Sequence, residues 1–200
     1  MRVLTFIFLV FAVSGIPGVA NEDRKILRSF INISQPKAAV DFGLSKLIKN
    51  DSDSDFLFLI ARGYQELKLN QEALQFYSES IAINRNNFKS YINRGLVFGA
   101  LGNLRASTID LKKAIALNPN SKEAHLNLGF TQAAQNDTTK AIESFSNALK
   151  IDPSFTEALR NRGITYHHLG KKQKACEDWI KSAKIKKDDV ETWVNEYCDS

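Results

Sequence analysis

The sequence predicts an all-α protein, an α-solenoid of antiparallel helix pairs that ends in a C-terminal capping helix. Residue types recur every 34 positions along most of the chain, and apolar residues recur every three or four positions within each repeat. The 10 glycines and 4 prolines among 200 residues are too few for the many tight turns of an all-β sandwich. With 44% hydrophobic and 24% charged residues, the composition is that of a folded globular chain and excludes a mostly disordered one.

Glycine, asparagine and proline residues each recur at this interval of 34 positions. Their members are Gly95, Gly129 and Gly163, then Asn93, Asn127 and Asn161, then Pro119 and Pro153. Chance does not easily make three residue types recur with one period, so the pattern indicates a repeated structural unit. In this register the chain contains four units, which span residues 54–87, 88–121, 122–155 and 156–189.

Each unit is expected to contain two helices joined by a short turn. In the third unit, segments 122–135 and 141–151 both place their apolar residues on one helical face. Between them Asn136 and Asp137 interrupt the pattern, where the second and fourth units have a glycine suited to the left-handed end of a helix. We expect Thr138 to provide the N-cap of the helix that follows.

Small residues mark the crossing of the two helices in each unit. Gly129 and its equivalents fall where the two backbones should approach most closely. A large side chain at Gly129 is therefore expected to overpack the crossing, at a cost of about 1–3 kcal/mol.

Both ends of the array follow the same pattern in a modified form. Residues 36–49 repeat the second-helix pattern weakly, and with 22–33 as their partner they make residues 21–53 a degenerate N-terminal helical repeat. At the other end, residues 190–200 carry an apolar stripe that includes Trp193 and Tyr197. A solenoid needs a terminal helix with one polar side, so we expect a capping helix there.

This pattern resembles the tetratricopeptide repeat, in which small, aromatic, alanine, phenylalanine and proline columns share a period of about 34 residues. The resemblance covers residues 54–189 directly and is clearest in segments 141–153 and 163–179. It implies a right-handed solenoid whose first helices line a concave groove that commonly takes a protein or an extended peptide. Arg94 and Arg162 depart from the family, because their column usually holds leucine.

The resemblance also suggests which residues face that groove. The expected peptide-binding residues are Asn93, Asn127, Asn161, Leu96, Phe130 and Ile164. An amide side chain can donate and accept hydrogen bonds together, so spaced asparagines can hold a peptide backbone while apolar neighbours take its side chains. The column resembles the asparagine ladder of O-linked N-acetylglucosamine transferase. Asparagine is also frequent at this position of the family for other reasons, and that alternative stays open.

The first twenty residues have the pattern of a secretory signal. An apolar run from Val3 to Ile16 follows Arg2 and precedes Pro17, and small residues end at Ala20. Cleavage after Ala20 would make the protein exported, either periplasmic or secreted. The alternative is an uncleaved membrane anchor, although the run is shorter than the roughly 20 apolar residues that a spanning helix needs.

Export bears on the two cysteines. Cys176 and Cys198 are the only pair in the chain, and in an oxidising compartment we expect them to form a disulfide. The capping helix should end beside the start of the helix before it, which would bring the two residues together. The alternative is two unpaired thiols.

The fourth unit carries most of the positive charge, with nine basic against three acidic residues between 156 and 187. The expected basic patch consists of Arg160, Arg162, Lys171, Lys172, Lys174 and Lys181. Such a patch could dock an acidic partner or an anionic membrane surface, whereas the simpler interpretation is a solvated helix face.

Catalysis finds little support in the sequence. The neighbours His167 and His168 point about 100° apart on a helix and cannot easily bind one metal, and His125 falls in a packing column. No nucleophile and base stand at a recognisable spacing, and no glycine-rich phosphate loop is present. We therefore expect no enzymatic activity, no metal, no cofactor and no nucleic-acid partner.

The sequence as a whole predicts an exported, non-catalytic scaffold or adaptor that binds a protein or peptide in a concave face. The alternative is a membrane-tethered assembly factor, which keeps its N-terminal anchor and docks an acidic partner through the lysine-rich fourth unit.

Overall fold

The computed structural model describes residues 21–47, 53–186 and 190–198, and within these residues every regular element is an α-helix. The helices are α1 (Asn21–Asn32), α2 (Pro36–Leu47), α3 (Ser54–Glu66), α4 (Asn70–Ile83), α5 (Phe88–Ala100), α6 (Leu104–Leu117), α7 (Lys122–Ala134), α8 (Thr138–Ile151), α9 (Thr156–His168), α10 (Lys172–Ile185) and α11 (Val190–Tyr197). The predicted all-α class is confirmed. The expected signal segment, residues 1–20, lies outside the described residues.

The helix boundaries follow the period of the sequence. The first helices of the four units, α3, α5, α7 and α9, begin at the interval of the sequence repeat, and so do the second helices α4, α6, α8 and α10. Helix α2 begins one full repeat before α4, so the pair α1 and α2 continues the register toward the N-terminus.

The turns between the two helices of a unit use one left-handed residue. Gly102 and Gly170 have φ angles of 78° and 69°, and Asn136 takes the same role at 62°. The expectation for Thr138 was wrong, because this residue is already the first residue of α8. The N-cap is Asp137, whose side chain accepts a hydrogen bond from the backbone N–H of Lys140 at 3.2 Å.

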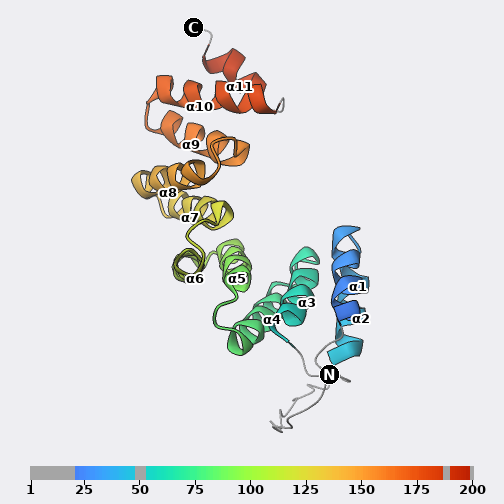
Figure 1. The fold of residues 1–200 in the computed structure, drawn as a ribbon. Coiled ribbons are helices and arrows are strands. Elements are labelled where there is room, and N and C mark those ends of the chain that lie inside the picture. Colours follow the sequence, from blue (N-terminus) through green and yellow to red (C-terminus); the bar gives the residue numbers. More distant parts are fainter. Residues whose placement is uncertain (1–20, 48–52, 187–189, 199–200) are drawn as a thin grey trace.

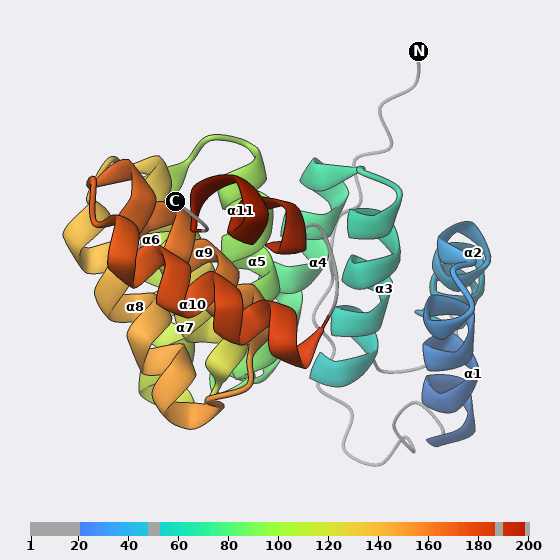
Figure 2. The same ribbon diagram turned by 90° about the horizontal axis from the view of Figure 1, so that it is seen from above.

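The helix pairs form a curved row in which each pair packs on the next (Figure 1). The first helices of successive units contact each other, as α3 does α5, α5 does α7 and α7 does α9. Among the described residues, the second helices of successive units have no contact of this extent and pack mainly on their neighbours in the chain. We call α3, α5, α7 and α9 the inner helices, because only the inside of a curve brings alternate elements together. Viewed from above, α1 and α2 stand as a separate pair at one end of the row, next to α3 (Figure 2).

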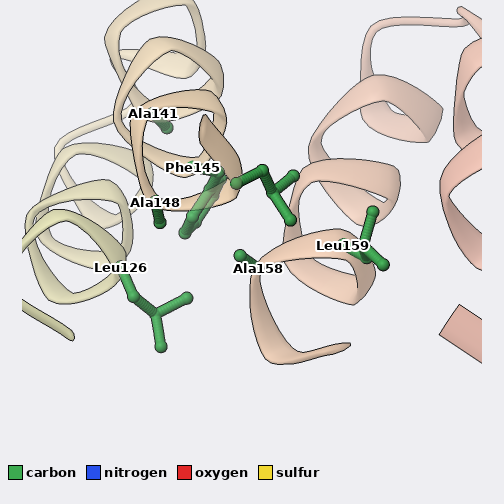
Figure 3. Packing of buried hydrophobic residues seen from close by; sticks show 7 residues of the cluster. Leu126, Ala141, Phe145, Ala148, Ala158 and Leu159 are labelled. Carbon is green, nitrogen blue, oxygen red and sulfur yellow. The ribbon is translucent and has the colours of Figure 1, made fainter. Parts of the chain in front are cut away.

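The core runs along the row as a series of small clusters between successive helices. In one of them Leu126 of α7, Phe145 of α8 and Ala158 of α9 share the same interior (Figure 3). The close crossing predicted at Gly129 is present, since a Cβ added there would lie 2.5 Å from Cε1 of Phe145. The fold therefore depends on pairing a small residue with a bulky one in each unit.

A buried ion pair joins some of the units. Arg94 of α5 forms a bidentate pair with Asp110 of α6, at 2.7 and 2.9 Å, and its third nitrogen donates to Ser78 of α4 at 3.0 Å. The side chain of Asp110 has almost no exposed surface. One arginine thus connects three helices and two units.

The same arrangement recurs two units later. Arg162 of α9 pairs with Asp178 of α10 at 2.8 and 2.7 Å and donates to Ser146 of α8 at 2.9 Å. In both places the hydrogen bonds to the aspartate raise the pKa of the arginine above its ordinary value. The two arginines that depart from the family pattern are therefore the centres of a repeated polar connection.

Candidate ligand-binding groove

Three hollows follow one another along the inner helices. The first, of about 560 Å³, extends from α3 across α5 to the start of α7. The second, of about 330 Å³, lies between α5 and α7 and also touches α6. The third, of about 400 Å³, lies between α7 and α9 and reaches the start of α8.

These hollows are parts of one continuous surface, because neighbouring hollows share wall residues. Leu96 and Asn127 line both the first and the second hollow, and Phe130 lines both the second and the third. We call this surface the inner groove. All six residues expected to bind a peptide lie on it, since Asn93 lines the first hollow and Asn161 and Ile164 line the third.

The asparagines of the groove are partly fixed by their own helices. The Asn93 amide donates to the backbone carbonyl of Lys89 at 2.9 Å, and the Asn161 amide donates to that of Glu157 at 2.6 Å. This bond uses one N–H and leaves the amide oxygen and the second N–H available for a guest. The side chain of Asn127 forms no hydrogen bond within the described part of the chain, and it sits where two hollows meet.

The apolar column of the groove centres on Phe130. Its side chain is 41% exposed, which is unusual for a phenylalanine in a folded chain. The ring packs edge-on against Phe145, with centroids 5.7 Å apart and an interplanar angle of 79°. Because Phe145 is buried, this contact holds the partly exposed Phe130 ring in place at the groove.

Sequence reasoning missed the walls that the second helices and the turns contribute. Leu104 of α6 lines the second hollow and Phe145 of α8 lines the third, and Asn118 and Asn120, between α6 and α7, line the first. Single columns of the repeat do not show which second-helix residue reaches past its partner helix. That information depends on the crossing of the two helices.

The basic residues predicted for the fourth unit differ in their exposure. The prediction that Arg162 belongs to an exposed basic patch was wrong, because this residue pairs with the buried Asp178 and has little exposed surface. Arg160 and Lys172 are also engaged in interactions. Lys171, Lys174 and Lys181 are exposed, and Lys174 lies 5.7 Å from the centre of the Tyr166 ring.

The C-terminal end of the row is closed by α11. Val190 is fully buried against Trp179 of α10, and the Trp193 ring lies 5.5 Å from the Trp179 ring. A disulfide joins Cys176 in α10 to Cys198 just after α11, with Cα atoms 5.6 Å apart. The capping helix is thus held by both apolar packing and a covalent bond.

The described residues contain no cluster of three or more histidine, cysteine or acidic side chains arranged to hold a metal ion. His167 packs its ring against Tyr197 at 4.9 Å, and His125 contacts the carbonyl of Pro119 at 3.1 Å. Among the same residues, no helix has the length and apolar character needed to span a bilayer.

Comparison with known sequences identifies the repeat. Profiles described as TPR repeat or tetratricopeptide repeat match three overlapping segments, residues 88–121, 111–143 and 133–170. No curated protein sequence matches the chain.

Solved structures share the fold at low sequence identity. A crystal structure of MamA has a TM-score of 0.71 and 20% identity, covering 86% of this chain and 98% of MamA. TTC0263, a thermophilic TPR protein of Thermus thermophilus, has a TM-score of 0.72 and 21% identity, over 87% and 95% of the two chains. YrrB, a TPR protein with an unusual peptide-binding site, has a TM-score of 0.68 and 20% identity, over 89% and 92%. Residues 88–170 are thus built of tetratricopeptide repeats, and the described chain folds as a tetratricopeptide-repeat solenoid.

Proposed function

We propose that the chain is a non-catalytic scaffold or adaptor that binds a protein or an extended peptide in the inner groove. One observation carries the proposal, namely that the three hollows share Leu96, Asn127 and Phe130 and so form a continuous track along the inner helices. An extended chain, rather than a compact small molecule, has the shape that such a track accommodates. The peptide-binding site of YrrB, on the same fold, adds support.

The groove has the chemistry that backbone recognition requires. Asn93, Asn127 and Asn161 recur once in each of three successive units, and each offers an amide oxygen and at least one N–H. Open apolar residues lie beside them on the same surface. A guest chain can therefore satisfy its own backbone polar groups while it buries side chains, which keeps the cost of desolvation low.

The test is to replace the three asparagines by alanine together and to measure binding of a displayed library of random peptides. We expect enrichment of binders by the unchanged chain and strong loss of their binding in the variant, with helical content preserved in circular dichroism. A matched control replaces Asn86, Asn147 and Asn195, three asparagines that do not line the groove. Undiminished binding in the groove variant would reject the role of the asparagine column.

We also propose that the protein acts outside the cytoplasm, after removal of residues 1–20. The apolar run from Val3 to Ile16 and the paired Cys176 and Cys198 support this location. Sequencing the N-terminus of the mature protein tests it. A mature chain that starts at Asn21 supports export with cleavage, whereas a chain that still starts at Met1 contradicts it.

A membrane-tethered scaffold is the second candidate. It is favoured by the exposed lysines of the fourth unit, Lys171, Lys174 and Lys181, which could meet an acidic partner. In that case Met1 would be retained and the protein would fractionate with membranes. Replacing the three lysines by glutamine would then release the partner without affecting peptide binding in the inner groove.

A further inference from the structure

The second and third hollows of the inner groove are lined, within the described chain, by no formally charged side chain. Their walls consist of apolar residues together with asparagine, serine, threonine and one histidine. The first hollow differs, because Arg62, Lys89 and Glu123 line it. In a chain that is 24% charged, two successive uncharged hollows indicate a distinct chemical preference in this part of the groove.

Phe130 forms the wall between these two hollows, and among the described residues it is the one that lines both. Leu96 and Leu104 line the second hollow together with it, and Ile164 lines the third. Each hollow therefore has its own apolar lining, and the two share one aromatic ring. Both hollows are within the size range, about 300–1,000 Å³, in which protein pockets enclose side chains or small ligands.

Each of the two hollows also has one asparagine at its edge that belongs to the repeating column, Asn127 in the second and Asn161 in the third. Their amides can bind the backbone of a guest, while the apolar walls can take its side chains. A charged guest side chain would find no opposite charge there and would lose its water, which is costly without a partner. Charge matching thus favours an uncharged guest segment.

We propose that the second and third hollows of the inner groove select an extended peptide segment that is uncharged and carries two large apolar side chains, one on each side of the Phe130 ring. The inference rests on the proposed function and specifies its ligand class. Charged residues of the guest belong at its flank, where Arg62, Lys89 and Glu123 line the first hollow.

The experiment uses fluorescein-labelled peptides of a neutral serine and glycine background, measured by fluorescence polarisation with the whole chain. One series carries two leucines separated by one, two, three or four residues. Matched peptides carry one leucine, two aspartates or two lysines in the same places. We expect at least one two-leucine spacing to bind ten-fold or more tightly than every matched peptide.

Two variants locate the binding. Phe130→Ala should weaken the two-leucine peptide at least ten-fold, whereas Ile109→Ala, which removes a 69% exposed side chain of α6 outside the groove, should not. Because the Phe130 ring also packs on Phe145, a second variant avoids the core. Ala100→Glu places a carboxylate at the exposed edge of the second hollow, and Ile109→Glu adds the same charge elsewhere.

Ala100→Glu should weaken the two-leucine peptide and strengthen binding of a peptide with one leucine and one lysine. The proposed selectivity for apolar side chains would be overturned if two-aspartate or two-lysine peptides bound as tightly as the two-leucine peptide. If that binding were lost when the three groove asparagines are replaced, the proposed function would stay intact. Absence of binding by every peptide and by the random library would overturn both.

Discussion

The second and fourth units reach back to the preceding unit through a buried arginine, whereas the first and third units have Ile60 and Leu128 at the same position. Leu128 belongs to an apolar cluster with Leu111 of α6, so the junction of the second and third units is held by side-chain packing alone at this point. At this one position a buried arginine and an apolar side chain therefore alternate from unit to unit along the row.

At this position the arginines connect neighbouring units through an ion pair and a hydrogen bond, whereas Leu128 does so through apolar packing. A buried ion pair gains Coulomb energy but loses the hydration of both charges, so its net contribution to stability is small. An apolar pair gains from burial and needs no directional partner. Removing one partner of the ion pair is strongly destabilising, because the other charge then stays buried without its partner.

Arg94→Ala is the most damaging single change that we expect at these junctions. It leaves the Asp110 carboxylate buried, at 4% exposure, without its partner. The free energy of unfolding should therefore fall by about 3–5 kcal/mol. Urea unfolding followed by circular dichroism measures it, with Arg105→Ala, an exposed arginine of the next helix, as the matched control.

A double variant tests whether one junction can be converted into the other. Arg94→Leu with Asp110→Ser gives the second unit the residues Leu128 and Ser144 of the third. Since no charge is then left buried, stability should return to within about 1 kcal/mol of the original or exceed it. If the double variant were as unstable as Arg94→Ala, the two chemistries would not be interchangeable.

The disulfide gives the fourth unit a constraint that the second lacks. Replacing Cys176 and Cys198 by serine opens a covalent loop with a sequence separation of 22 residues. The chain-entropy relation predicts a loss of about 3 kcal/mol for a loop of this size. Hydrogen exchange should show the loss in α10 and α11, while α5 and α6 keep their protection. A uniform loss along the row would contradict a local role of the bond.

The helix crossings of the second and third units are expected to differ in their tolerance of a methyl group. A Cβ at Gly129 meets the buried Phe145 ring at 2.5 Å, whereas one at Gly95 meets Cγ of Leu111 at 3.1 Å. Gly129→Ala should therefore cost about 1–3 kcal/mol and Gly95→Ala less. Thermal unfolding compares them, with Gly99→Ala as control, since the nearest atom there is 3.5 Å away. Equal costs would show that ring size does not set the tightness of the crossing.

An exposed ion pair of the third unit should contribute least. Lys122 donates to Asp152 at 2.6 Å, and with help from Ser154 it lowers the pKa of Asp152 from 3.8 to about 2. A lowered pKa in the folded state adds stability that is complete above the ordinary pKa and is lost as the pH falls toward 2. Asp152→Asn should remove this part of the acid dependence between pH 4 and pH 2 in thermal unfolding. An unchanged acid profile would mean that the pair does not hold in solution.

The repeat register was predictable from sequence because it depends on glycines at positions where a larger residue would be strained or would not fit. Gly102 has a positive φ, and Gly129 lies under a phenylalanine ring, so both positions reveal local backbone structure. The N-cap of α8 was not predicted, because Asp137 and Thr138 are both good capping residues and neighbours in the chain. Sequence preference alone does not choose between them.

The groove column was also accessible to sequence reasoning, because its members share one face of equivalent helices. The role of Arg94 was not recognised, although its partner Asp110 follows sixteen residues later and Arg162 and Asp178 repeat that spacing. The signal was present as a column that alternates between charged and apolar residues. The arginine recurs only in every second unit, so the repeat of one unit does not show it.

The alternating connection makes the molecule periodic in steps of two units and not of one. In the intact array Ser146 accepts a hydrogen bond from Arg162. If the third unit were excised, Lys112 would take the place of Ser146, and two positive charges would meet. Excising the second and third units together would set Arg162 against Ser78, and the acceptor would be restored. Removing the third unit alone should accordingly destabilise a shortened array more than removing the second and third units together.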